Sequence, residues 1–344
     1  MDELLTSVSD SVGRITLNRP QALNAITHGM ILGIRDTLAH WEHDSEVSLV
    51  VIDGAGDRGL SAGGDIRALH ANAVAGRNDL SRHFWHDEYA LCVTIAEYAK
   101  PVVSIMDGIT MGGGVGVSAH AAIRIVTERS RVAMPETRIG FSPDVGGTRL
   151  LSRAPGELGT YLALNGATMT GADAVACGFA DYYVPSDRLP HLIQALGERA
   201  DPGSPAEVVL LFDETPPPSA LSARRDWIDR CYAPDTVAGI LERLGAESDR
   251  DATNAADELT TLSPLALTIA LAAVRVARDL GSLREVLDQE YRVSAWLAEQ
   301  PDLAEGIRAQ VIDKDRKPRW MPSTLAAVPS TVVEAALHHH PPRH

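Results

Sequence analysis

The chain has 344 residues, with 31 basic and 46 acidic side chains, a net charge of −15 and 45% hydrophobic residues. The apolar fraction excludes a purely disordered chain, and only three cysteines in so long a chain exclude a disulfide scaffold. The acidic balance argues against nucleic acid or an anionic membrane as a partner, but it does not exclude a small anionic ligand.

The cellular setting is predicted from what the sequence lacks. The opening MDELLTSVSD has no cationic segment followed by an apolar one, so we expect no signal peptide. No apolar run approaches the ~18–20 residues that a membrane-spanning helix needs. Cys92, Cys177 and Cys231 lie far apart, without a CxxC pair, and are interpreted as reduced thiols. We therefore expect a soluble, cytoplasmic protein without a metal site.

Short β-branched runs alternate with helical patterns in the first two hundred residues, which is typical of an α/β architecture. In chain order, the predicted elements are strand 12–17, helix 27–42, strand 49–53, helix 66–71, strands 101–106, 123–127 and 132–134, and helix 147–164. A Pro- and Ser-rich connector follows near 199–225, and helices are predicted at 265–278 and 283–298. The terminal residues, with His338–His340 among prolines, are predicted to form a loose tail rather than a metal site.

Two glycine-rich segments could present backbone N–H groups to a ligand. Ser61–Asp65 reads SAGGD, and its small residues allow close approach of a ligand to the backbone. The alternative is a glycine turn in which Asp65 caps the helix at 66–71. Gly112–Gly114 could place N–H groups at a helix N-terminus facing an oxyanion, and tight helix packing is the alternative. A dinucleotide fingerprint would need a third glycine where Val117 stands.

A third segment, residues 134–147, carries two acids with proline and glycine between them. Glu136 and Asp144 are eight residues apart, so a loop that folds back could bring both carboxylates to one cleft as a general acid/base pair. The alternative makes Glu136 a helix-start acid and Asp144 a cap for the helix beginning near Gly147. Two glycine loops and one acidic loop, each at a strand end, together favour an oxyanion hole with acid/base groups.

With these motifs the chain resembles the enoyl-CoA hydratase/isomerase (crotonase) superfamily. The resemblance includes Ile15–Pro20 (ITLNRP) and Ala22–Ala25 (ALNA), in addition to the two glycine segments. Within the superfamily it is closest to the branch of 3-hydroxyisobutyryl-CoA hydrolases. The segments that carry this narrower resemblance are GITMGGGVG, AMPET, PDVGG, Glu88 in HDEY, and near the C-terminus EGIRA and IDKD with Pro318 and Trp320.

The resemblance implies a spiral of ββα repeats followed by a helical C-terminal region, often assembled as trimers or hexamers. On this basis we expect a crotonase-like core with the acyl-CoA site at 1–198, a variable connector with helices at 199–260, a helical region at 261–325 and the loose tail at 326–344. The implied substrate is a CoA thioester, so that CoA enters with the substrate and no other cofactor is expected.

The resemblance also assigns roles to residues. Backbone N–H groups of Ala62, Gly63 or Gly64 and of Gly113 would form the oxyanion hole, helped by the helix that opens at Gly112. Glu136 and Asp144 would be catalytic, with the division of roles between them open, as is the choice between a general base and a covalent anhydride. The implied substrate-binding residues are Glu88, Gly113, Glu136, Asp144 and Asp65.

Two other functions stay open beside the hydrolysis of 3-hydroxyisobutyryl-CoA, a valine-catabolism intermediate. One is an enoyl-CoA hydratase or isomerase that uses Glu136 alone. Hydratases of the family usually have a second glutamate where this chain has Gly116, and a glycine where it has Asp144. Both residues therefore argue against hydration or isomerisation of an enoyl-CoA. The other is an acyl-CoA-binding protein without catalysis. Arg19, Arg67 and Lys314 are candidates for the CoA phosphates.

Overall fold

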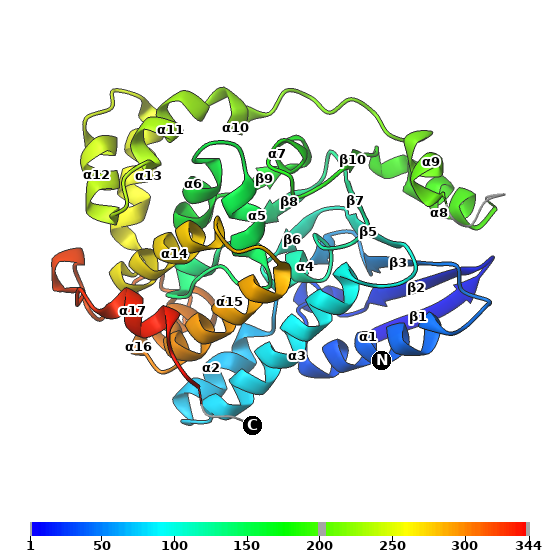
Figure 1. Ribbon diagram of the computed structural model, residues 1–344, viewed down its shortest axis with the longest axis horizontal. Coiled ribbons are helices and arrows are strands. Elements are labelled where there is room, and N and C mark those ends of the chain that lie inside the picture. Colours follow the sequence, from blue (N-terminus) through cyan, green and yellow to red (C-terminus); the bar gives the residue numbers. More distant parts are fainter. Residues whose placement is uncertain (1, 199–203, 342–344) are drawn as a thin grey trace. The chain divides into compact units, whose positions relative to one another are not determined.

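The computed structural model describes residues 2–198 and 204–341. The chain forms two compact units, each of which is discontinuous in sequence. The first unit consists of Met1–Gly64, Asp87–Ala133 and Met169–Ala220, and the second of Asp65–His86, Met134–Thr168 and Leu221–His344. Helices α3 (Asn78–Ala96) and α10 (Ala220–Ala223) each contain residues of both units (Figure 1).

A six-stranded sheet in the order β1-β2-β3-β5-β7-β10 dominates the first unit. All neighbouring strands are parallel except β1 and β2, which form a hairpin. Asp10 and Ser11 close this hairpin with positive φ angles of 49° and 62°, as a two-residue hairpin turn requires. The strands are β1 (Leu4–Ser9), β2 (Val12–Leu17), β3 (Leu49–Gly54), β5 (Val102–Met106), β7 (Ile123–Val126) and β10 (Tyr182–Tyr183).

A second sheet of the same unit has four strands in the order β4-β6-β8-β9. These are β4 (Gly59–Ser61), β6 (Ile109–Met111), β8 (Arg131–Ala133) and β9 (Met169–Thr170), parallel except for the last pair. Three times in succession, a strand of the larger sheet is followed by a strand of the smaller one: β3–β4, β5–β6 and β7–β8. This succession confirms the expected α/β fold of ββα repeats.

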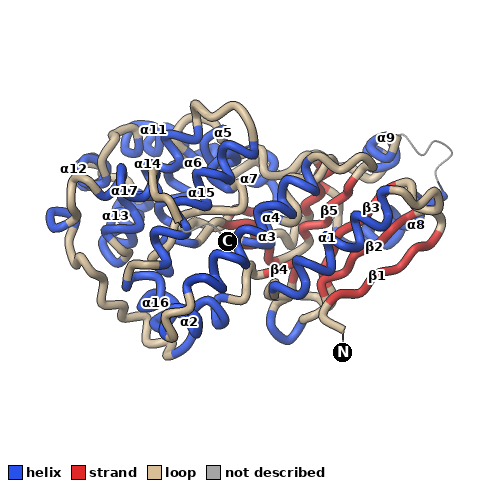
Figure 2. The backbone as a smooth tube through the Cα atoms, turned by 60° about the horizontal axis from the view of Figure 1, so that its bottom comes forward, coloured by secondary structure: helices blue, strands red, loops and turns tan. Residues whose placement is uncertain are grey.

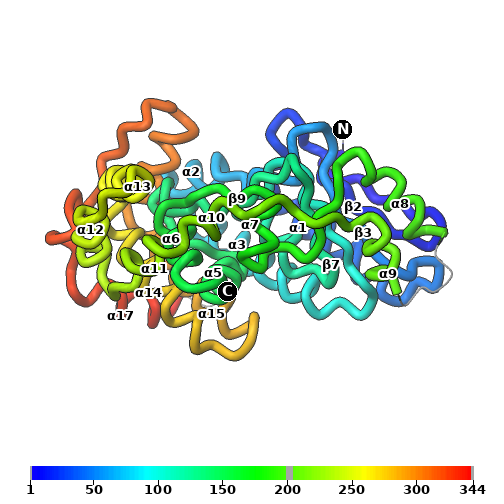
Figure 3. The backbone as a smooth tube through the Cα atoms, turned by 90° about the horizontal axis from the view of Figure 1, so that it is seen from above, coloured from blue at the N-terminus to red at the C-terminus, as the bar shows by residue number. Residues whose placement is uncertain are grey.

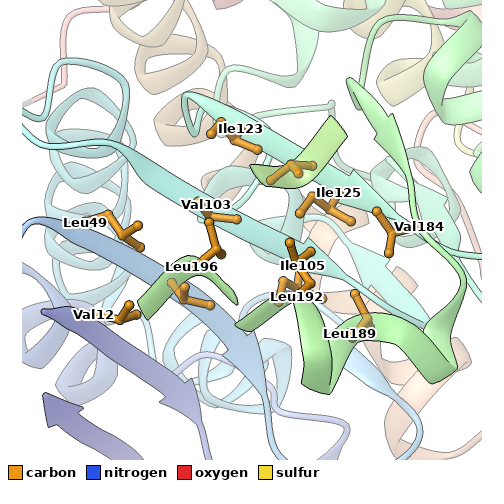
Figure 4. Packing of buried hydrophobic residues seen from close by; sticks show 12 residues of the cluster. Val12, Leu49, Val103, Ile105, Ile123, Ile125, Val184, Leu189, Leu192 and Leu196 are labelled. Carbon is orange, nitrogen blue, oxygen red and sulfur yellow. The ribbon is translucent and has the colours of Figure 1, made fainter. Parts of the chain in front are cut away.

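The core of the first unit lies between the larger sheet and α8 (Leu189–Glu198), as Figure 4 shows. The parallel strands are buried on both faces, which explains why β3 and β5 are mostly apolar, interrupted only by Asp53 near the end of β3 and by the buried Ser104 in β5. Leu189, Leu192 and Leu196 recur at helical spacing and point toward Val103 and Ile105 of β5. The other helices of this unit are α1 (His28–Glu42), α4 (Gly113–Gly116), α7 (Gly171–Ala176) and α9 (Pro205–Leu210).

The second unit is almost entirely helical (Figure 2). Its central element is α14 (Pro264–Ala277), which contacts α5, α6, α12, α15 and α17. Its helices are otherwise α2 (Ile66–Val74), α5 (Gly147–Arg153), α6 (Leu158–Asn165), α11 (Arg225–Tyr232), α12 (Val237–Gly245), α13 (Arg250–Thr261), α15 (Leu283–Ala298), α16 (Pro301–Ile307) and α17 (Val332–Leu337). A 3-10 turn at Glu136–Ile139, η2, belongs to this unit as well.

Most elements predicted from the sequence are present, and the exceptions have local causes. The helix predicted at 147–164 is wrong as one element, because Ala154 leaves the helical region and Gly156 has a φ of 59°, so the chain forms α5 and α6. The connector expected near 199–225 includes the short helices α9 and α10, and residues 199–203 lie outside the described residues. The tail expected to be loose contains α17, with Val332 and Ala336 buried, while 342–344 lie outside the description.

The domain ranges expected from the sequence also differ from the compact units. Segments 134–168 and 261–325, expected in separate domains, both belong to the second unit, while 169–198 belongs to the first (Figure 3). Among the described residues, no single helix is long and apolar enough to cross a membrane; α13 and α14 meet that test only as a pair bent by 116°. The described part of the chain also contains no group of three or more His, Cys, Asp or Glu side chains arranged to hold a metal ion.

The buried thiols lead to a first prediction. Cys92, Cys177 and Cys231 are free and buried, and burial raises the pKa of Cys177 to about 12. Because reaction requires an accessible thiolate, a thiol reagent at pH 8 should label none of the three in the folded protein within minutes, as counted by mass spectrometry. Unfolding in urea is the control and should expose all three. Rapid labelling of the folded protein would contradict this packing.

Candidate functional site

Parallel pairing of β4 and β6 brings the two glycine segments of the first unit together. Residues 62–64 follow β4 and residues 112–114 follow β6, at the same end of adjacent strands. A Cβ atom at Gly113 would lie 3.1 Å from Gly64 N, and one at Gly63 would lie 3.0 Å from Met111 O. The sequence favours glycine here because the two backbones approach too closely for side chains.

The hydrogen bonds of these loops identify which N–H groups can face a ligand. Ala62 N–H donates to Leu23 O at 2.9 Å, and Gly63 N–H donates to Ser61 Oγ at 3.1 Å. The sequence predicts one oxyanion donor from Ala62, Gly63 or Gly64, and because the first two N–H groups bond within the fold, Gly64 is the candidate that remains. The N–H groups of Gly64 and Gly113 donate to no acceptor among the described residues, and these two form the candidate pair of donors.

The triple glycine packs tightly at Gly114 and leaves the N–H group of Gly113 available as a donor. Tight packing requires Gly114, because a Cβ atom there would lie 2.7 Å from Ser61 O. Gly113 begins α4, but this helix has only four residues, so its dipole adds less than a full helix would. Ser118 donates its hydroxyl to Gly114 O at 2.6 Å and thereby supports the turn.

Glu88 lies directly against the candidate oxyanion donors. It comes from α3, only 2% of it is exposed, and a Cβ atom at Gly113 would lie 2.5 Å from its Oε1. The first unit therefore joins two backbone donors and one carboxylate within a few ångströms. Asp65, by contrast, begins the second unit, and its side chain makes no capping hydrogen bond to α2, which it was expected to cap in the alternative interpretation.

Glu136 begins η2 in the second unit and is 7% exposed. Phe141 N–H donates to Glu136 O at 3.0 Å, which closes the turn. The neighbours of Glu136 anchor it: Thr137 donates its hydroxyl to Leu164 O at 3.0 Å, and Arg138 donates to Asn165 O at 2.9 Å and pairs with Glu258. The carboxylate thus projects from a rigid turn.

Asp144 lies on the same loop, just before α5, and is 6% exposed. Gly147 N–H donates to Asp144 O at 2.7 Å. The next residue, Val145, is buried and has a φ of 52°, a conformation that a β-branched residue rarely adopts. Such strained residues often occur at functional sites.

Glu290, the acid that caps α5, is not predicted from the sequence. It is on α15 and 1% exposed, and its carboxylate accepts Gly146 N–H at 2.6 Å and Thr148 N–H at 2.9 Å. Burial raises the pKa of Glu290 to about 8, and the charge of Asp144 shifts it in the same direction. An acid on the apolar face of the predicted helix 283–298, between Val286 and Val293, was the available signal.

The predicted site residues therefore divide into two groups, one in each unit. Gly64, Gly113 and Glu88 form the group of the first unit. Glu136 and Asp144 lie on one loop of the second unit, and Asp144 is close enough to Glu290 for its charge to raise the pKa of Glu290. Of the cations suggested for CoA phosphates, Arg19 pairs with Glu3, Arg67 donates to Val311 O, and Lys314 is exposed.

Comparison with known proteins supports the family resemblance. Residues 12–337 match the family described as enoyl-CoA hydratase/isomerase. The mitochondrial 3-hydroxyisobutyryl-CoA hydrolase of Danio rerio is 41% identical over 340 residues, which cover 96% of this chain and 88% of that protein. The names of this relative and of those from Xenopus tropicalis and Homo sapiens include a mitochondrial location.

These names contradict the cytoplasmic location expected from the sequence. A targeting segment is a processing signal outside the folded domain, so the residues of the domain do not determine the compartment.

Two solved structures share the fold over almost the whole chain. A carnitinyl-CoA dehydratase from Mycobacterium thermoresistibile has a TM-score of 0.95 and 48% identity, and the match covers 99% of this chain and 98% of that one. An enoyl-CoA hydratase from Rhodobacter sphaeroides 2.4.1 has a TM-score of 0.92 and 44% identity, with 98% of each chain covered. With the fold, the glycine pair and the acidic loop all in agreement, the chain belongs to the enoyl-CoA hydratase/isomerase family.

Proposed function

We propose that the chain hydrolyses acyl-CoA thioesters and that its substrate is 3-hydroxyisobutyryl-CoA, which gives 3-hydroxyisobutyrate and CoA. The observation that carries this proposal is the pair of N–H groups at Gly64 and Gly113 beside the buried carboxylate of Glu88. The hydrolase names of relatives such as the one from Danio rerio support the choice of reaction and substrate.

In this mechanism the thioester oxygen accepts hydrogen bonds from Gly64 N–H and Gly113 N–H. As the carbonyl carbon becomes tetrahedral, its oxygen gains negative charge, and each preorganised donor stabilises that charge by about 3–4 kcal/mol. Glu88 lies against Gly113, where its carboxyl group can hydrogen-bond the hydroxyl group of the acyl chain.

Glu136 supplies the base or the nucleophile. Its carboxylate either removes a proton from the water that attacks the carbonyl, or attacks the carbonyl itself and forms an anhydride that water then opens. In both routes the C–S bond breaks and CoA leaves as a thiol. Asp144 assists proton transfer and binds the substrate hydroxyl. CoA enters with the substrate, and the mechanism uses no further cofactor.

Hydration of a double bond is the second candidate, because the two solved structures are named as a dehydratase and a hydratase. That reaction needs two positioned acid/base groups. Gly116 lies in the buried turn of α4 and provides no carboxylate where hydratases of the family usually have their second glutamate.

We also propose a homo-oligomer, a trimer or hexamer, by analogy with the family.

The direct test compares two reactions on one preparation. Release of free thiol from 3-hydroxyisobutyryl-CoA should be fast, while hydration of crotonyl-CoA should be at least about 100-fold slower, because one acid/base group of the hydratases is replaced by Gly116. Hydration without thiol release would refute the proposal in favour of the second candidate. Binding of both esters without turnover would indicate a binding protein.

Glu136→Gln should lower kcat for thiol release by about 10³-fold, because the amide can neither accept the proton of water nor attack the carbonyl. The dissociation constant of the CoA ester, measured by calorimetry, should change less than about threefold. Glu258→Gln is the matched control, because Glu258 holds Arg138 of the same turn without entering the proposed chemistry. Near-normal kcat in Glu136→Gln would disprove the assignment.

Gly113→Ala keeps the backbone N–H group but should lower kcat by about 10²–10³-fold, as much as the loss of one oxyanion donor, because its side chain would keep the thioester oxygen from that donor. The added Cβ would lie 2.5 Å from Glu88 Oε1 and 3.1 Å from Gly64 N, and it would therefore obstruct the space between the donors. Gly245→Ala, in α12 with nothing within 4 Å of the added Cβ, should leave kcat unchanged. Circular dichroism of both variants checks the fold, and full activity of Gly113→Ala would contradict the proposed hole.

A further inference from the structure

We propose that Glu290 is a positioning residue for Asp144: it fixes the Asp144 loop by accepting hydrogen bonds from the first residues of α5. This inference rests on the proposed function in one respect: it takes Asp144 to be a residue that takes part in the reaction. The contacts that support it all lie within the second unit.

Glu290 reaches the start of α5 from another helix and replaces the missing local cap. Gly146 is the N-cap residue and has no side chain to accept the free N–H groups of the first turn. Glu290 Oε2 accepts Gly146 N–H at 2.6 Å, while Oε1 accepts Thr148 N–H at 2.9 Å and the Thr148 hydroxyl at 2.5 Å. Glu290 and Thr148 are both buried, so water does not compete for these bonds.

The segment that Glu290 holds contains the strained residue next to Asp144. Val145 has a φ of 52°, and a non-glycine residue in this region costs on the order of 1–3 kcal/mol. Such a conformation persists only where neighbouring contacts fix it. Here Gly147 N–H donates to Asp144 O at 2.7 Å, and Glu290 fixes Gly146 on the other side of Val145. Without Glu290, relaxation of Val145 would redirect the side chain of Asp144.

The position requires a carboxyl group rather than an amide, in either protonation state, because the oxygen of an O–H group still accepts a hydrogen bond and an amide nitrogen does not. Both oxygens of Glu290 accept, one from Gly146 and the other from Thr148. A glutamine has only one acceptor oxygen, so its NH₂ group would face one of these N–H donors. Leu, Met and other apolar residues would leave all three donors unsatisfied in a buried site. The acid thus has a role that packing alone does not explain.

The test is a double-mutant cycle on kcat for thiol release. Glu290→Gln should lower kcat about 10–100-fold, because misplacement of a catalytic group by about 1 Å costs on that order. Asp144→Asn should also lower kcat. Glu290→Gln added to Asp144→Asn should cause no further loss beyond about twofold, since the first residue acts through the second. A structural role would instead give losses that multiply.

A matched control and a second variant keep the test decisive. Glu157→Gln removes another carboxylate of the second unit, which pairs with Arg275 and Arg278; it should lower the Tm but leave kcat within about twofold. If Glu290→Gln does not fold, Thr148→Val removes one of the three donors and should lower kcat by a smaller factor, again only when Asp144 is present.

Failure of the proposed function and failure of the proposed role of Glu290 give different results in these experiments. A wild-type chain that releases no thiol would refute the function, and the cycle is then measured with the activity that the chain does show. An active wild type with losses that multiply in the double variant would overturn the role of Glu290. The role of Glu290 would also be overturned if Glu290→Gln and Thr148→Val lowered the Tm but left kcat unchanged.

Discussion

The close approach of the loops after β4 and β6 is the constraint on which the candidate site depends. Parallel pairing of two short strands brings two glycine segments so near that a Cβ atom at Gly113 or Gly114 would meet the opposite backbone at 3.1 or 2.7 Å. This contact explains both the glycines and their position. It also leaves the N–H groups of Gly64 and Gly113 side by side, where they can receive a developing oxyanion.

The acidic loop of the second unit depends on a different constraint, the satisfaction of buried polar groups. Glu290 accepts from the start of α5, and Asp302 of α16 accepts the Ser263 hydroxyl at 2.5 Å and Met321 N–H at 2.7 Å. Gly140, which ends the turn of Glu136, lies so close that a Cβ atom would meet Asp302 O at 2.5 Å. The helices of the C-terminal region therefore shape the loop that carries Glu136 and Asp144, instead of forming a separate appendage.

The choice between hydrolysis and hydration rests on few positions within a shared fold. The solved structures that are 44% and 48% identical are named as a hydratase and a dehydratase, whereas the relative from Danio rerio, 41% identical, is named as a hydrolase. Overall identity therefore does not separate the reactions. The proposed function separates them by chemistry, since Gly116 supplies no acid/base group and Asp144 supplies a carboxylate.

The sequence by itself determined the α/β class, five of the strands, the two glycine loops and the acids Glu136 and Asp144. These follow from local periodicity, glycine and proline positions and motif spacing, which act over a few residues. Only the tertiary structure decided which N–H groups remain available, because Ala62 and Gly63 donate to Leu23 and Ser61. It alone decided that Glu290, 146 residues after Asp144 in sequence, caps α5, since an acid on the apolar face of its own helix does not indicate which distant helix it contacts. The break between α5 and α6 and the helix in the C-terminal tail depend on packing in the same way.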